Sequence, residues 1–220
     1  MMPLTLKVDS VQLSFDGRRI LRSVWLNCGQ GEIIGLLGRN GSGKSSLLKI
    51  IFGSLIPDYK YVSINDKFIT KGYINNSIAY LPQHNYLPGG IRISSLAPML
   101  VDKLFWDEFK EQPVYKNHHH KTVSQLSGGE LRILEILMII YNKANFILLD
   151  EPFTHISPIQ TEFLKPIIKA CGQRKGIIIT DHQYYNVLDV SDKVIILDNG
   201  CTKPVNHMDE LVTYGYLSGL

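Results

Sequence analysis

Three segments of this chain contain residues that could bind and cleave a phosphorylated ligand, beginning with a glycine-rich loop. "GRNGSGKS", from Gly38 to Ser45, matches the pattern G-x-x-x-x-G-K-[ST], follows an apolar run and precedes a helical pattern. Glycines let successive backbone N–H groups turn towards one phosphate chain, and a helix N-terminus adds partial positive charge. Lys44 offers a charge to β- and γ-phosphates, and Ser45 offers a hydroxyl to Mg²⁺. The predicted nucleotide-binding residues here are Gly38, Asn40, Gly41, Ser42, Gly43, Lys44, Ser45 and Ser46.

A pair of acids forms the second segment. "FILLDEP" is an apolar run that ends in Asp150 and Glu151. The carboxyl ends of central parallel strands meet at the edge of the sheet where phosphate loops lie. We therefore predict that Asp150 holds Mg²⁺ and that Glu151 polarises a water aimed at the γ-phosphate. Two solvated acids at the end of a strand are the alternative, which the upstream glycine loop makes less favourable.

The third segment, "GIIITDH", places His182 just after another apolar run. A histidine there can donate a hydrogen bond to a γ-phosphate oxygen, so we predict a catalytic role beside Glu151. Gln83 in "YLPQ" also follows a strand-like run and could contact the metal or its water. Either residue alone could equally be an ordinary surface side chain. The predicted metal-binding residues are Ser45, Gln83 and Asp150.

A second glycine pair lies in "SQLSGGELRI", residues 124–133. Ser127 and Glu130 have the spacing of a capping box, so an ordinary helix start is one interpretation. The exposed donors of such a helix N-terminus can also bind an anion. The segment taken alone leaves both interpretations open.

The pattern of apolar residues indicates the elements that position these segments. Two alternating runs around Asp16-Gly17 predict a hairpin, and residues 57–80 predict further short strands and turns. Apolar residues at helical spacing predict a helical subdomain over residues 84–125. From Leu131 onwards helical and strand patterns alternate, which indicates a parallel sheet covered by helices. We expect one α/β domain over residues 1–220: a P-loop NTPase with a mostly parallel core sheet, a small N-terminal antiparallel β part and this helical subdomain.

Bulk properties exclude several classes of protein. The chain has 220 residues and a net charge of +3, with basic residues scattered, so no nucleic-acid partner is expected. The three cysteines are far apart and odd in number, which favours a reducing cytosol over a disulfide framework. "LRILEILMIIY" is the longest apolar run, and it is too short and too charged to cross a bilayer. A role at a membrane would need another chain.

The ordered set "GRNGSGKS", "YLPQ", "LSGGE", "FILLDEP" and "TDH" resembles the ATP-binding subunit of ABC transporters over nearly the whole chain. "LSGGE" is similar to that family's signature motif, whose common form ends in Gln. The resemblance implies that two copies, or two related ATPase subunits, stack head to tail. The signature of one copy then closes over the γ-phosphate of ATP held by the other. Its nucleotide-binding residues would be Ser127, Gly128, Gly129 and Glu130.

The resemblance implies further partners and a location. Phe15 would stack on adenine, with a core strand aromatic as the alternative. Residues 84–125 would carry the groove for a cytoplasmic helix of an integral membrane permease. ATP and Mg²⁺ are the expected cofactors. The chain is expected in the cytoplasm, on the inner face of the membrane. The resemblance does not identify the transported substrate.

Two segments depart from the family pattern or lie outside it. "THIS", Thr154 to Ser157, stands where the family usually has "SALD", so Ser157 replaces an Asp. His118 to His120 precede the signature, and we expect a solvated loop there, because consecutive side chains on a regular element cannot all face one metal ion.

Two other functions remain open on the residues alone. One is an ABC-type ATPase in a cytosolic assembly process such as iron–sulfur cluster assembly. The other is a P-loop kinase that passes the γ-phosphate to a small molecule, which "LSGGE" and His182 disfavour. DNA-repair and chromosome-organising relatives are disfavoured, because the interval between Lys44 and Leu126 is too short for their long coiled coil.

Overall fold

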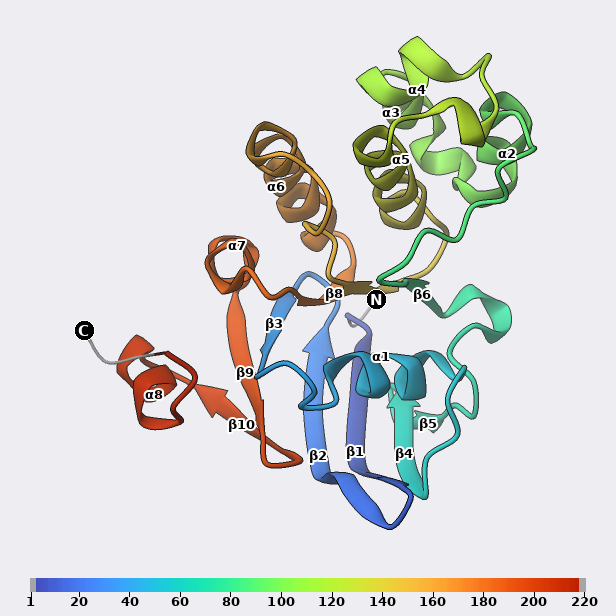
Figure 1. The fold of residues 1–220 in the computed structure, drawn as a ribbon. Helices are drawn as coiled ribbons and strands as arrows, with labels where there is room; N and C mark the ends of the chain where they lie inside the picture. Colours follow the sequence, from blue (N-terminus) through green and yellow to red (C-terminus); the bar gives the residue numbers. More distant parts are fainter. Residues whose placement is uncertain (1–2, 218–220) are drawn as a thin grey trace.

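The computed structural model describes residues 3–217 and is built on one ten-stranded sheet with the strand order β5-β4-β1-β2-β10-β9-β3-β8-β7-β6 (Figure 1). The strands are β1 Thr5–Phe15, β2 Arg18–Gly29, β3 Ile33–Leu37, β4 Tyr59–Ile64, β5 Lys67–Phe68, β6 Ile78–Leu81, β7 Phe146–Asp150, β8 Gly176–Thr180, β9 Lys193–Asp198 and β10 Cys201–Val205. The helices are α1 Lys44–Phe52, α2 Ile93–Leu100, α3 Trp106–Lys110, α4 Pro113–His118, α5 Gly128–Ile140, α6 Pro158–Gly172, α7 Tyr184–Val190 and α8 Met208–Thr213. Short 3₁₀ turns are η1 Ile74–Asn76, η2 Lys103–Phe105 and η3 Val123–Gln125.

The predicted parallel core is confirmed. Parallel pairs join β9 to β3, β3 to β8, β8 to β7 and β7 to β6. In the last rung between β7 and β8, Asp150 lies opposite Thr180. Because these strands run in the same direction, the segments that follow β3, β6, β7 and β8 all leave the same edge of the sheet. That edge positions the candidate site.

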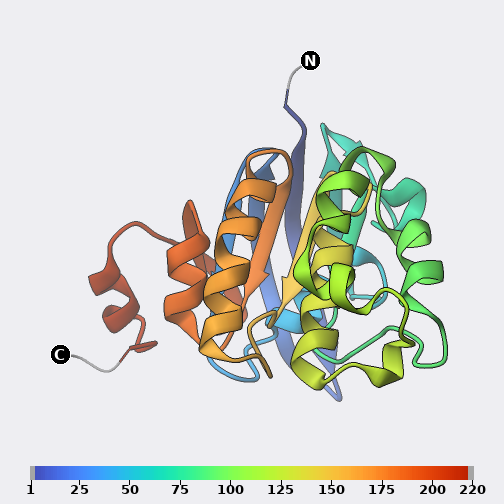
Figure 2. The same cartoon turned by 90° about the horizontal axis from the view of Figure 1, so that it is seen from above.

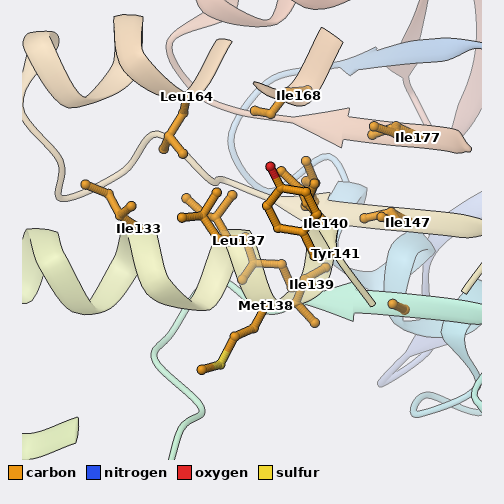
Figure 3. Packing of buried hydrophobic residues seen from close by; sticks show 14 of the residues in the cluster. Ile133, Leu137, Met138, Ile139, Ile140, Tyr141, Ile147, Leu164, Ile168 and Ile177 are labelled. Atoms are coloured by element: carbon orange, nitrogen blue, oxygen red, sulfur yellow. The ribbon is translucent and has the colours of Figure 1, made fainter. Parts of the chain in front are cut away.

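Alternate residues of the central strands face two separate cores, as the two-residue period of a strand requires. Ile147 and Leu149 of β7 pack into a core shared with α5, α6 and α7, and Leu148 packs into a core shared with α1. Figure 3 shows Leu137 of α5 beside Leu164 of α6 in the first of these cores. Burial on both faces explains why the strands read as continuous apolar runs.

The antiparallel N-terminal part is also confirmed. β1 and β2 pair as a hairpin that turns at Asp16 and Gly17, which have φ of 47° and 76°. Positive φ at both turn residues matches the right-handed twist of the flanking strands. Apolar residues of β1 and β2 pack against α1, so this part of the sheet covers the helix that follows the phosphate loop.

Helices α2, α3 and α4 follow β6 and precede α5 in the chain, within the residues for which a helical subdomain is expected. They lie together beside α5 (Figure 1). Aromatic rings hold this group together: Phe109 lies with its ring centroid 4.9 Å from Tyr115 and 5.8 Å from Trp106. Figure 2 shows these helices on the side of the molecule opposite α8. No helix within residues 3–217 is long and apolar enough to span a bilayer.

One hairpin was not predicted from the sequence. β9 and β10 pair antiparallel across Asn199 and Gly200, whose φ values are 49° and 78°. The Asn-Gly dipeptide after an apolar run is a strong hairpin signal and could have predicted this turn. Cys201 also pairs with Ser23 of β2, which joins the parallel and antiparallel parts into one sheet.

Candidate functional site

A cavity of about 550 Å³ lies at the edge of the sheet where the parallel strands end. It gathers residues from the β1–β2 turn, the loop after β3, the start of α1 and the ends of β6, β7 and β8. The residues that line it are Phe15, Ile20, Asn40, Gly41, Gly43, Lys44, Ser45, Ser46, Gln83, Glu151 and His182. Ten of these eleven, all except Ile20, are predicted site residues.

The glycine-rich loop curls around the Lys44 side chain. Gly41 and Gly43 have φ of 79° and 105°, values that residues other than glycine rarely adopt. The Lys44 ammonium donates to the carbonyl oxygens of Gly38 and Arg39 at 2.7 and 3.2 Å. Burial lowers the pKa of Lys44, and the nearby Glu151 and Asp150 oppose this shift. Among the residues that the structure describes, this ammonium donates to these two carbonyl oxygens, which leaves its third N–H for a phosphate.

Asp150 is fully buried at the end of β7. Its Oδ1 accepts from the Ser45 hydroxyl at 2.9 Å, and its Oδ2 accepts from the Tyr80 hydroxyl at 2.8 Å. Burial raises the pKa of Asp150, and the hydrogen bonds from Tyr80 and Ser45 oppose this shift. A hydroxyl beside a carboxylate is an oxygen donor set that fits Mg²⁺. Tyr80, on the neighbouring strand β6, was not among the predicted residues.

The Glu151 carboxylate is the point where the remaining polar residues meet. Gln83 donates to its Oε2 at 2.8 Å, and the Thr154 hydroxyl donates to the same oxygen at 3.4 Å. His182 places Nδ1 3.8 Å from that oxygen and 3.3 Å from the buried Asp181. Glu151 itself has φ of 50°, so the chain turns sharply and directs the carboxylate into the cavity.

Arg132 supports both acids through their backbone, although sequence reasoning missed it. This buried side chain of α5 donates to the carbonyl oxygens of Pro82, Asp150 and Glu151 at 2.8, 3.1 and 3.0 Å. Its partner Glu135, one turn further along α5, is also fully buried. An Arg and a Glu three residues apart inside an apolar run were a signal of a buried polar contact.

The second glycine segment does not line the cavity. Ser127 caps α5, and both halves of the predicted capping box with Glu130 are present. Ser127 and Gly128 are exposed, and first-turn N–H groups have no acceptor within their helix. A Cβ on Gly129 would lie 2.9 Å from the Gln160 side chain, so the glycine permits close contact with α6. Among the predicted loop residues, Gly38 and Ser42 also lie outside the cavity lining.

Ser157 has a local role that accounts for its type. It caps α6, accepting from the Gln160 N–H at 3.3 Å, while its own N–H donates to the Gln160 side chain at 2.9 Å. Asp and Ser are both good N-caps, so either residue can begin this helix.

The expectation of a solvated loop over His118 to His120 is wrong for His118. This residue ends α4, its side chain is only 18% exposed, and its Nε2 lies 3.0 Å from Oε1 of Glu130. Val114 and Tyr115 are the buried residues of α4, and His118 lies four and three residues after them, so it shares their inward face. His119 and His120 are exposed, as expected. Within residues 3–217 no cluster of three metal-ligating side chains is present.

The strand order, the phosphate loop and the acid-lined cavity define a nucleotide-binding protein of the P-loop class. The family model described as "ABC transporter" matches residues 21–154, more than half of the chain. The chain therefore belongs to the ABC transporter family, as its ordered motifs predicted, and it is an ATPase subunit of that family.

Relatives with curated names support this assignment. The lipopolysaccharide export system ATP-binding protein LptB of Acidithiobacillus ferridurans is 30% identical over 94% of this chain and 92% of its own length. LptB of Escherichia coli K12 is 30% identical over 89% of this chain and 88% of its own. The spermidine/putrescine import ATP-binding protein PotA of Mycoplasma mycoides is 25% identical over 94% of this chain and 62% of its own length.

Solved structures show the same fold. An ATP-binding subunit of an ABC transporter superposes with a TM-score of 0.81 at 20% identity, covering 97% of this chain and 95% of its own. A bacterial Atm1-family ABC exporter with ATP bound superposes with a TM-score of 0.79 at 19% identity, covering 97% of this chain and 41% of its own.

Proposed function

We propose that this chain hydrolyses Mg-ATP as one half of a head-to-tail dimer and drives a separate membrane-spanning partner. One observation carries the proposal. The cavity brings together the phosphate loop, Glu151, Gln83 and His182. Ser127 and Gly128 lie outside it and are exposed. A second copy can bring its own Ser-Gly-Gly corner to the open side of the cavity. ATP would then be bound by residues of both copies.

The residues around the cavity divide the binding of ATP between them. Lys44 and the N–H groups of the glycine loop would hold the β- and γ-phosphates. Ser45, Asp150 and Gln83 would hold Mg²⁺, which supplies the positive charge that offsets charge on the phosphates. Phe15 is 48% exposed at the end of β1, where its ring is free to stack on adenine.

Hydrolysis would depend on Glu151 and His182. Glu151 can take a proton from a water that lies between it and the γ-phosphate, because its carboxylate faces the cavity. Gln83 and Thr154 hold that carboxylate, and His182 is near enough to orient it. His182 would donate to a γ-phosphate oxygen once nucleotide binds.

Helices α2 to α4 offer the surface for a permease on the cytoplasmic face of the membrane. Met99 is 80% exposed and Leu104 is 81% exposed, and both lie within this helical group. Large apolar side chains exposed at this level fit a helix from a partner protein.

Substitution of the proposed base tests the dimer. Glu151→Gln should bind ATP without turning it over, so the dimer should accumulate in Mg-ATP, whereas the variant should remain monomeric in ADP. Light scattering coupled to size exclusion measures this directly. A variant that stays monomeric in saturating Mg-ATP, with bound nucleotide confirmed by fluorescence, would contradict the proposal.

Co-purification decides the partner. An integral membrane protein that purifies with the chain supports a transporter, and a cytosolic assembly complex supports the alternative function.

A further inference from the structure

A contact between α4 and α5 lies directly beside the signature segment. His118, the last residue of α4, places Nε2 3.0 Å from Oε1 of Glu130, the third residue of α5. The two side chains are 18% and 35% exposed, so solvent reaches the contact only partly. They also line one shallow groove with Phe163 of α6.

The Glu130 carboxylate is held from both of its oxygens. Oε2 accepts from the Ser127 N–H at 2.8 Å and from the Ser127 hydroxyl at 2.7 Å, while Oε1 faces His118. The hydrogen bonds from Ser127 lower the pKa of Glu130. Glu130 therefore carries a negative charge at neutral pH, directly beside the donors of Ser127.

The surroundings of His118 select its tautomer. Its Nδ1 is buried and has no hydrogen-bond partner among residues 3–217. With the proton on Nδ1, that buried N–H would have no acceptor, and the bare Nε2 would face another acceptor, Oε1 of Glu130, at 3.0 Å. Of the two tautomers, the one with its proton on Nε2 is favoured, and that N–H donates to Oε1 of Glu130.

We propose that His118 is a positioning residue that lets the signature of this chain accept a phosphate although it carries a carboxylate. The Nε2–H bond fixes Glu130 with Oε2 against Ser127 and draws charge towards Oε1. Without it, only the Ser127 hydrogen bonds hold the carboxylate, and its Oε1 presents more negative charge to an incoming anion beside the Ser-Gly-Gly corner. This inference depends on the proposed function, in which that corner meets the γ-phosphate bound by a second copy.

A double-mutant cycle in the Glu151→Gln protein tests the role of His118. His118→Ala should raise the ATP concentration at half-maximal dimerisation about tenfold, on the scale of one hydrogen bond to a charged group. His118→Gln, which keeps a donor, should recover most of that loss. With Glu130→Gln present, which removes the charge, His118→Ala should change the midpoint less than about twofold.

His119→Ala is the matched control, because the polar contact of this exposed neighbouring ring is with the Lys116 carbonyl oxygen and its ring neighbours are Tyr115 and His120. It should leave the midpoint unchanged. If His118→Ala causes the same loss whether Glu130 is intact or replaced through Glu130→Gln, its role is purely structural and the inference is overturned. No loss with Glu130 intact would overturn it as well. Thermal unfolding of each monomer verifies that the variants fold.

A measurement on the monomer separates this inference from the proposed function. Nitrogen-15 NMR of the nucleotide-free protein should show the His118 proton on Nε2, with the Nε2 resonance shifted by Glu130→Gln. A dominant Nδ1–H tautomer would overturn the inference even if the dimer forms. Failure of the Glu151→Gln protein to dimerise would instead overturn the proposed function.

Discussion

At the scale of single residues, the site is organised by hydrogen bonds to two adjacent carboxylates with different surroundings. Asp150 is buried and held by two hydroxyls, whereas Glu151 faces the cavity and is held by an amide and a hydroxyl. Such a difference suits one carboxylate to a fixed position near a metal and the other to proton transfer. Tyr80 is the residue that distinguishes the environment of Asp150 most directly.

Tyr80→Phe is expected to weaken the use of Mg²⁺ while leaving the fold intact. The substitution removes the 2.8 Å hydrogen bond that opposes the rise in the pKa of Asp150, and it keeps the ring beside Phe52. We expect ATPase activity at limiting Mg²⁺ to fall about fivefold, the scale of one lost hydrogen bond, and to recover at high Mg²⁺. Titration of ATPase rate against Mg²⁺ measures this. An unchanged midpoint would contradict it, and replacement of the exposed Tyr59 of β4 by Phe serves as the control.

At the scale of elements, α5 connects the signature segment to Asp150 and Glu151 within one chain. It begins at the Ser-Gly-Gly corner, and one turn later Arg132 holds the carbonyl oxygens of Asp150 and Glu151. Glu135 then accepts from the N–H groups of Tyr86 and Leu87 at 2.7 and 3.2 Å, in the segment that follows Gln83. A displacement of α5 would therefore reach both acids and the Gln83 segment together.

Glu135 should make stability depend on pH. Burial raises its folded-state pKa above the ordinary 4.5, and the backbone hydrogen bonds and Arg132 only partly oppose this. The folded state therefore retains the proton to higher pH than the unfolded state. The resulting stabilisation is complete below pH 4.5 and is lost as pH rises through the folded pKa. Urea unfolding gives the free energy of unfolding of the wild type and of Glu135→Gln at each pH in this range. The value for the wild type should fall relative to that of the variant as pH rises. A constant difference between the two proteins would refute this.

At the scale of the whole molecule, the proposed active site belongs to two copies. The cavity and the Ser-Gly-Gly corner lie on separate parts of one chain, so one rotation of a second copy can close two sites at once. A chain with a damaged cavity and a chain with a damaged Ser-Gly-Gly corner should then form a mixed dimer that contains one intact site.

Mixing Lys44→Ala with Gly128→Asp tests this arrangement. Lys44→Ala removes the charge for phosphate, and Gly128→Asp adds a repelling charge where a Cβ meets nothing within 4 Å. Each variant alone should be nearly inactive. An equal mixture should regain roughly a quarter of the wild-type ATPase rate, because random pairing gives half of the dimers one intact site each. A mixture no more active than its components would exclude a site shared between copies.

The sequence by itself determined the family, the parallel core, the N-terminal hairpin and ten of the eleven residues around the cavity, because each of these follows from short segments. Glycine spacing, apolar runs and turn residues are local properties that can be identified in a single sequence. Only the tertiary structure decided that Tyr80 and Arg132 hold the acids, and that His118 contacts Glu130. These contacts join different strands and helices, and their partners are chosen by packing of the folded chain, which no local pattern encodes.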